Sequence, residues 1–98
     1  MSTLFVIAKI TPKPEFFEQA KNALLAIISD TLNEPECLQF VLHQDSNQEN
    51  LFLYEEFENE LALKLHHEQP YTQAVMRHYE EWLAAPLEIT ILSKLTPS

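Results

Sequence analysis

The chain has 98 residues, 46% of them hydrophobic, and this length suits a single domain, residues 1–98, with one modest core. Its formal net charge of −9, with only six lysines and arginines, argues against nucleic acid or an anionic membrane surface as a partner, because both bind clustered basic residues. The chain contains no glycine and a single cysteine, Cys37, so it offers neither a glycine-rich phosphate-binding loop nor an internal disulfide.

The first third of the chain predicts a strand followed by a helix. Leu4 to Ile10 is a nearly continuous apolar run, which is typical of a central strand covered on both faces. Pro12 and Pro14 end this strand, since proline cannot donate a ladder hydrogen bond. A helix is then expected from about Glu15 to Asn33 or Glu34, with an apolar stripe made of Phe17, Ala20, Leu24, Ile27 and Ile28.

The middle of the chain predicts a β-hairpin. Residues Leu38 to Gln44 alternate between apolar and mixed positions, and Leu51 to Phe57 alternate with both faces mostly apolar. The polar segment Asp45 to Asn50 between them suits a turn, because Asn and Asp tolerate left-handed backbone better than most residues. The two strands are therefore expected to pair antiparallel.

The last third predicts two helices and a strand. Leu61, Leu65 and His66 follow at helical spacing, and a second helix is expected to begin at Pro70, where a missing amide donor costs nothing. Pro86 then separates this helix from a final alternating strand, Leu87 to Leu95. The second helix carries one stripe, formed by Tyr71, Ala74, Val75, His78, Tyr79 and Trp82.

This element order packs as an α+β two-layer sandwich, with a four-stranded antiparallel sheet and the helices on one face. The other sheet face then remains uncovered and apolar. An exposed patch of this kind is typical of an interface, so we expect a symmetric homodimer in which two sheets face each other. The expected patch consists of Phe5, Ile7, Val41, Phe52, Tyr54 and Leu92.

Several motifs resemble the antibiotic biosynthesis monooxygenase domain. The segment LYEEF, Leu53 to Phe57, followed by Ala62-Leu63, His66 and Pro70-Tyr71, is similar to the family's strand ending in Glu-x-aromatic and the helix carrying histidine. Glu34 to Leu38 resembles its Glu-Pro-Gly-Cys turn, and Pro86-Leu87 the start of its last strand. The resemblance implies a ferredoxin-like fold that assembles as a dimeric α/β barrel. It also implies an activity among quinol monooxygenases, polyketide monooxygenases, haem-degrading enzymes and an isomerase.

Three positions depart from the family pattern. Glu36 stands where the family usually has glycine, so this turn is expected to be relaxed differently or strained. Tyr71 stands where several relatives have a second histidine, and Ala8 where some members place a pocket asparagine. These departures bear on which reaction of the family the chain performs.

The resemblance implies that His66 is the catalytic base. An imidazole has an ordinary pKa of about 6.5, so it can accept a proton from a phenol or quinol hydroxyl near neutrality. Glu55 shares the inner strand face with apolar neighbours and is expected to pair with His66 or a backbone donor, as either an orienting or a structural group. His67 and Glu68 are expected to be solvated.

A flat aromatic substrate is expected to lie in a cleft between sheet and helix. Phe57, Tyr71, Val75 and His78 are the expected substrate-binding residues, whereas Tyr79 and Trp82 favour the core. A metal site built from His66, His78 and Glu55 is not supported by any zinc-ligand spacing, so no metal and no other cofactor is expected.

The resemblance therefore predicts a cytoplasmic, cofactor-independent monooxygenase that oxidises a small electron-rich aromatic with O2. Two alternatives stay open. The same histidine and carboxylate would serve an isomerase or lyase acting on a small hydroxy-carbonyl compound, and a dimeric module that only binds a small ligand would need no turnover. The absence of any apolar run as long as a membrane span or signal-peptide core supports the cytoplasm and excludes membrane insertion.

Overall fold

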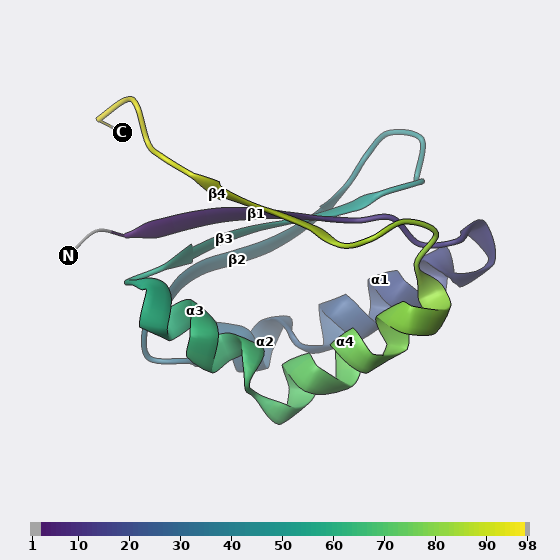
Figure 1. Cartoon of the computed structure of the whole chain (residues 1–98), viewed down its shortest axis with the longest axis horizontal. Helices are drawn as coiled ribbons and strands as arrows, with labels where there is room; N and C mark the ends of the chain where they lie inside the picture. Colours follow the sequence, from purple (N-terminus) through teal and green to yellow (C-terminus); the bar gives the residue numbers. More distant parts are fainter. Residues whose placement is uncertain (1–2, 98) are drawn as a thin grey trace.

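The structure, a computed structural model, describes residues 3–97 and confirms the α+β, ferredoxin-like sandwich (Figure 1). One antiparallel sheet contains four strands in the order β2-β3-β1-β4. Its strands are β1 Leu4–Ile10, β2 Cys37–Gln44, β3 Leu51–Phe57 and β4 Glu88–Leu92. Figure 1 shows the helices gathered beneath one face of this sheet. They are a 3-10 turn at Pro14–Phe16, α1 Phe17–Ala26, α2 Ile28–Leu32, α3 Glu60–His67 and α4 Pro70–Trp82.

The single helix expected from Glu15 to Asn33 is in fact interrupted. Ile27 leaves helical geometry, with φ of −100° and ψ of 1°, between α1 and α2. The hydroxyl of Thr31 donates to the carbonyl of Ile27 at 2.7 Å, and a side-chain bond of this type bends a helix. The apolar stripe still faces the sheet, since Phe17, Ala20, Leu24 and Ile27 are all buried.

The β2–β3 hairpin is held by an aspartate at its base. The carboxylate of Asp45 accepts from the backbone N–H groups of Glu49 and Asn50 at 2.9 and 3.1 Å. Gln48, rather than an Asn or Asp, adopts the left-handed backbone, with φ of 57°. Among residues 3–97 no other residue has a positive φ, so Glu36 occupies the family's glycine position without left-handed strain.

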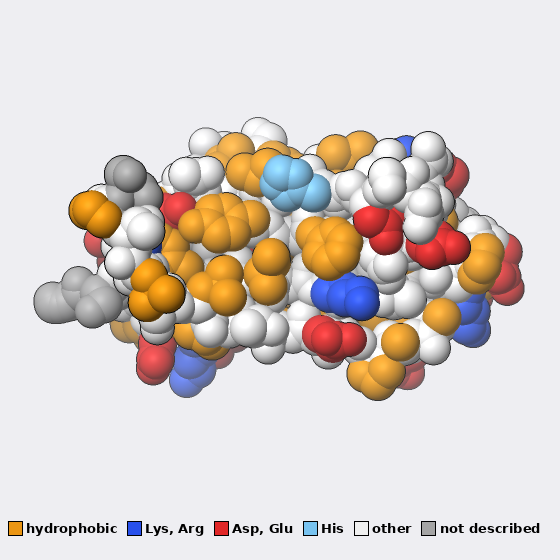
Figure 2. Space-filling model, turned by 90° about the horizontal axis from the view of Figure 1, so that it is seen from above, with side chains coloured by type: hydrophobic (Ala, Val, Ile, Leu, Met, Phe, Trp, Pro, Cys, Tyr) orange, Lys and Arg blue, Asp and Glu red, His pale blue; other side chains and the backbone are white. Residues whose placement is uncertain are grey.

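The strand register separates an inner sheet face from an outer one. On the inner face, which the helices cover, Val6 lies opposite Glu55 in β3, and Ala8 lies opposite Leu53. The core is built on this face from Val6, Ala8, Ile10, Phe40, Leu51, Leu53 and Phe57 together with the helix stripes. On the outer face the expected apolar patch is present, with every member only partly buried or exposed. Figure 2 views this outer face and shows hydrophobic side chains gathered across it.

The edge strand β4 is shorter than expected and incompletely covered. It ends at Leu92, which pairs with Phe5 near the start of β1, so little of β1 remains to pair with a longer strand. Ile91 and Ile89 lie opposite the buried residues Val6 and Ala8, yet they remain 54% and 43% exposed. The helical layer therefore leaves the β4 side of the inner face partly open.

Local capping positions α3 and α4 under the sheet. Asn59 caps α3 by accepting from the N–H of Ala62 at 2.9 Å, and Pro70 occupies the first turn of α4 as expected. The far end of α4 is tied to the end of β1, because Lys13 N–H donates to the Trp82 carbonyl at 2.7 Å. None of the helices in residues 3–97 combines the length and hydrophobicity that crossing a membrane would require.

Candidate functional site

The histidine predicted as the base is buried between α3 and the sheet. His66 lies in the last turn of α3 and is only 3% exposed. The rings of Phe40 and Phe57, on the inner faces of β2 and β3, pack against the imidazole with centroid separations of 5.2 and 5.3 Å. Packing on two sides therefore restricts the orientation of the imidazole.

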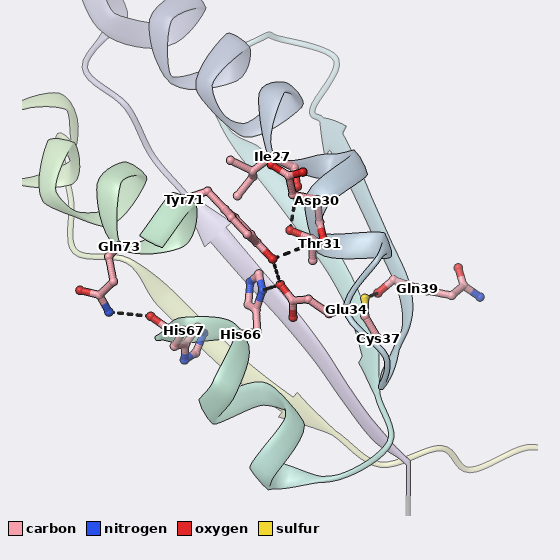
Figure 3. Close-up of polar contacts among 10 residues, drawn as sticks. All are labelled: Ile27, Asp30, Thr31, Glu34, Cys37, Gln39, His66, His67, Tyr71 and Gln73. Carbon is pink, nitrogen blue, oxygen red and sulfur yellow. Dashed lines mark hydrogen bonds and ion pairs between the residues drawn. The ribbon is translucent and has the colours of Figure 1, made fainter. Parts of the chain in front are cut away.

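Glu34 is the carboxylate that contacts His66. Its Oε2 lies 3.0 Å from Nδ1 of His66, and the hydroxyl of Tyr71 donates to the same oxygen. Figure 3 shows the two side chains, from α3 and α4, converging on Glu34 in the turn that follows α2. The expected pairing of His66 with Glu55 does not occur in residues 3–97. The sequence interpretation missed Glu34 because the Glu34-Pro35 motif was assigned only a turn-forming role.

This network leaves one imidazole nitrogen available for proton transfer. The Glu34 carboxylate accepts from Nδ1–H and so favours the tautomer in which Nε2 keeps its lone pair. This tautomer is assigned from the hydrogen-bond network. Burial, and then the hydrogen bond to Glu34, raise the pKa of the Tyr71 hydroxyl far above its ordinary value. Tyr71 therefore remains a hydrogen-bond donor to Glu34 at neutral pH.

Glu55 has a different environment from Glu34. It lies on the inner face of β3 and is 4% exposed, and within residues 3–97 its Oε1 has no hydrogen-bond partner. Burial, and secondly the nearby Glu34 carboxylate, raise the pKa of Glu55 to about 7. Near neutrality Glu55 is thus divided between a carboxylate and a neutral acid that can donate a hydrogen bond.

His66 and Glu55 border a small cavity between the sheet and α4, here called the inner cavity. Its volume is about 40 Å³, which is room for roughly two or three water molecules or one polar substituent of a ligand. Its hydrogen-bonding walls are Glu55, His66, His67, Thr72 and Tyr79. Its apolar walls are Ala8, Ile10, Leu24, Ile27, Phe40, Leu53, Val75, Met76, Leu87 and Ile89.

Two larger surface hollows flank the buried histidine. The β4 groove has a volume of about 420 Å³, shares His67 with the inner cavity, and is lined by Leu4, Glu60, Leu63, Lys64, His67, Glu68, Gln73 and Ile91. The α3 pocket, of about 330 Å³, is lined by Glu34, Pro35, Glu36, Cys37, Phe57, Leu61, Ala62, Leu65 and Gln69. An aromatic ring is too large for the inner cavity, so a ring would have to occupy one of these hollows.

The structure separates the four residues predicted to bind substrate. Val75 lines the inner cavity, Phe57 is fully buried and borders the α3 pocket, and Tyr71 contacts Glu34. His78 is exposed and outside these hollows, stacked on Trp82 with ring centroids 4.5 Å apart. Its place on the helix stripe is therefore explained by packing on Trp82.

Three other polar residues line the inner cavity. His67 was expected to be solvated, but it is half-buried in the cavity wall, and burial and then His66 lower its pKa. Tyr79 packs against the core as expected and also lines the cavity, where burial and then Glu55 raise its pKa. Thr72, which the sequence interpretation did not single out, is buried in the same wall. The only sequence feature that could have indicated Thr72 is its polar side chain at a position between the stripe residues Tyr71 and Val75.

Residues 3–97 contain neither a metal-binding cluster nor an activated thiol. Within residues 3–97 no cluster of three histidine, cysteine or acidic side chains is arranged to hold a metal ion. Burial, and then Glu34, raise the pKa of Cys37 to about 11, so this residue is a neutral thiol at physiological pH. Cys37 is therefore a poor nucleophile.

Comparisons with known proteins support the resemblance seen in the sequence. A family model described as "Antibiotic biosynthesis monooxygenase" matches residues 3–82. A relative from Mycobacterium tuberculosis named "Putative monooxygenase Rv0793" is 28% identical over 94 residues, which cover 96% of this chain and 93% of the relative. Its solved structure matches with a TM-score of 0.92 at 27% identity, covering 99% of each chain. The structure of PA3566 from Pseudomonas aeruginosa matches with a TM-score of 0.90 at 28% identity, covering 98% and 97% of the two chains.

Proposed function

Because the chain belongs to the antibiotic biosynthesis monooxygenase family, we propose that it is a cofactor-independent monooxygenase that oxidises a small electron-rich aromatic with O2. The substrate class is a quinol or a polyketide-like phenol. The observation that carries the proposal is the buried His66, whose Nδ1 lies 3.0 Å from Glu34 while its ring borders a cavity. A carboxylate behind an imidazole is an arrangement that orients a general base.

In this scheme Nε2 of His66 removes the hydroxyl proton of the substrate. The resulting anion is electron-rich and supplies all four electrons that O2 takes up. Two are used in forming the new C–O bond, and two, released as the quinol becomes a quinone, reduce the other oxygen atom to water. A naphthoquinol and O2 would thus give a hydroxynaphthoquinone and water. Glu34 accepts from Nδ1–H and stabilises the imidazolium that forms, while Tyr71 holds Glu34 in place.

The size of the inner cavity suggests how such a substrate would bind. A volume of about 40 Å³ admits a hydroxyl group but not a ring. Ile89 lines the inner cavity and Ile91 lines the β4 groove. Both are partly exposed, so β4 offers an apolar surface between the two. We therefore propose that the ring lies in the β4 groove and inserts its hydroxyl toward His66.

The test is oxygen consumption with a reduced naphthoquinone. His66→Ala should lower kcat/KM at least tenfold, because a placed general base typically contributes about 10² to 10⁴ in rate. Replacing His78, an exposed histidine on α4 that lines neither the inner cavity nor the two hollows, by alanine is the matched control and should leave kcat/KM within about twofold. An unchanged value in His66→Ala would dismiss His66 as the base.

An isomerase or lyase is the second candidate, and the position of Glu55 favours it. The carboxyl group of Glu55 borders the same cavity as His66, so the site holds two groups that could move protons on a hydroxy-carbonyl compound. Turnover without oxygen would identify this class. Saturable binding of a small aromatic with no turnover in either condition would instead indicate a binding module.

We also propose that the protein is a homodimer that joins outer sheet faces. The support is the patch of Phe5, Ile7, Val41, Phe52, Tyr54 and Leu92, which the helices do not cover (Figure 2). We propose in addition that the protein is cytoplasmic, because a reducing compartment suits the single free thiol of Cys37.

A further inference from the structure

Two buried polar atoms in the inner cavity have no hydrogen-bond partner among residues 3–97. They are Oε1 of Glu55 and Oγ of Thr72, and the two residues are only 4% and 5% exposed. A buried polar group without a partner is costly, and such groups are usually satisfied by protein, water or ligand. Both residues line the same cavity, one from β3 and one from α4.

Thr72 differs in this respect from the other buried threonine of the helical layer. Thr31 satisfies its hydroxyl locally, by donating to the carbonyl of Ile27 at 2.7 Å. Thr72 lies in the first turn of α4, where the residue four positions earlier, Glu68, precedes the helix, and within residues 3–97 its hydroxyl makes no hydrogen bond. Its hydroxyl is therefore available to a group inside the cavity.

The other polar residues that line the cavity make no hydrogen bond to Oε1 of Glu55 or to Oγ of Thr72. Most of the cavity lining is apolar, and the Nδ1 atom of His66 is already bound to Glu34. The raised pKa of Glu55 means that its neutral acid form is well populated at neutral pH, so the residue can donate as well as accept. Each of the two side chains can therefore donate a hydrogen bond to an oxygen atom of a ligand.

We propose that Glu55 and Thr72 form a ligand-oxygen subsite, which binds one hydroxyl or carbonyl oxygen of a flat aromatic ligand in the inner cavity. The aromatic nature of this ligand rests on the proposed function, whereas the subsite itself rests on the two unpartnered atoms. Through this subsite the protein selects ligands that carry an oxygen substituent. Glu55 thereby acts as a specificity determinant, and the proton-transfer role stays with His66.

The experiment measures binding without turnover, by anaerobic equilibrium dialysis of the whole chain against 1-naphthol and 1-methylnaphthalene. These probes have similar size, and only the first has the hydroxyl. The wild-type protein should bind 1-naphthol at least tenfold more tightly. Equal affinity for the two probes, including no binding of either, would overturn the proposal.

Thr72→Val and Glu55→Leu should each weaken 1-naphthol at least tenfold and leave 1-methylnaphthalene within twofold, because only the hydrogen bonds to oxygen are lost. Glu55→Gln keeps a donor and an acceptor and should stay within about threefold, which covers the case in which Glu55→Leu fails to fold. Thr31→Val, the matched control at a buried threonine outside the cavity, should leave both affinities unchanged. Wild-type affinity for 1-naphthol in Thr72→Val, or in a folded Glu55→Leu, would mean that the pair holds internal water only and would overturn the proposal.

The same samples separate this proposal from the proposed function. His66→Ala should lose turnover with the reduced naphthoquinone while still preferring 1-naphthol, because the subsite residues are intact. Loss of the 1-naphthol preference with normal oxygen consumption would refute the subsite alone. Normal preference with no oxygen consumption in the wild type would refute the monooxygenase alone.

Discussion

Replacing Glu55 by glutamine should stabilise the protein relative to the wild type. This stabilisation should be larger at alkaline pH than at acidic pH. Glu55 is 4% exposed and its Oε1 has no partner within residues 3–97, so its ionised form is poorly stabilised in the folded protein. Glutamine has nearly the same shape and cannot ionise. The variant therefore removes the electrostatic cost while keeping the packing.

The magnitude follows from the pKa of Glu55, which burial and secondly Glu34 raise from 4.5 to about 7. That difference is a factor of about 300 in proton affinity and corresponds to about 3 kcal/mol. Because the folded state holds the proton more tightly than the unfolded state, stability falls as pH rises. The cost begins near pH 4.5 and is complete above about pH 7.

The assay is urea unfolding followed by circular dichroism at several values from pH 5.5 to pH 8, which stay above the isoelectric point of about 4.7. Over this window the free energy of unfolding of Glu55→Gln should rise by about 2 kcal/mol relative to the wild type. Comparison with the wild type cancels the titration of groups that do not interact with Glu55. Glu80→Gln, at an exposed position of α4, controls for the loss of one negative charge. A difference between Glu55→Gln and wild type that does not change with pH would refute the reasoning.

Two further predictions concern the network around Glu34 and the outer sheet face. Tyr71→Phe removes the hydroxyl that donates to Glu34 and should lower the free energy of unfolding by about 1 kcal/mol in urea titrations at pH 7; no loss would mean that this contact is not maintained in solution. Ile7→Lys places a charge in the middle of the outer patch, where Ile7 lies opposite Tyr54, and should convert a dimer to a monomer in sedimentation velocity. A wild-type protein that sediments as a monomer would contradict the proposed dimer.

Much of the fold could be predicted because alternation and helical spacing report which residues share a face. The strands Leu4–Ile10 and Leu51–Phe57 were predicted with the bounds that the structure has. The interruption at Ile27 was not predicted, because a continuous apolar stripe does not reveal that the hydroxyl of Thr31 bends the backbone. The shorter β4 was missed because strand length depends on where its partner β1 begins.

The candidate site was predicted only in part. The family motif led to His66, and inward alternation along Leu51–Phe57 led to Glu55, both of which border the inner cavity. His78 shares a helix stripe with Val75, but the stripe is wide enough that one edge faces the cavity and the other edge is exposed. Spacing along one helix cannot distinguish these edges, because the rotation of α4 against the sheet decides which of them is covered.

The sequence by itself determined the order of the elements, the face on which each apolar side chain lies, and the family to which the chain is similar. These properties are local, since they depend on residues a few positions apart in one strand or helix. The tertiary structure alone decided that Glu34 meets His66 and Tyr71, which are 32 and 37 positions away in the chain. It also decided that Glu55 and Thr72 share one cavity without a protein partner, because the angles and offsets at which helices pack on the sheet are set by the whole core.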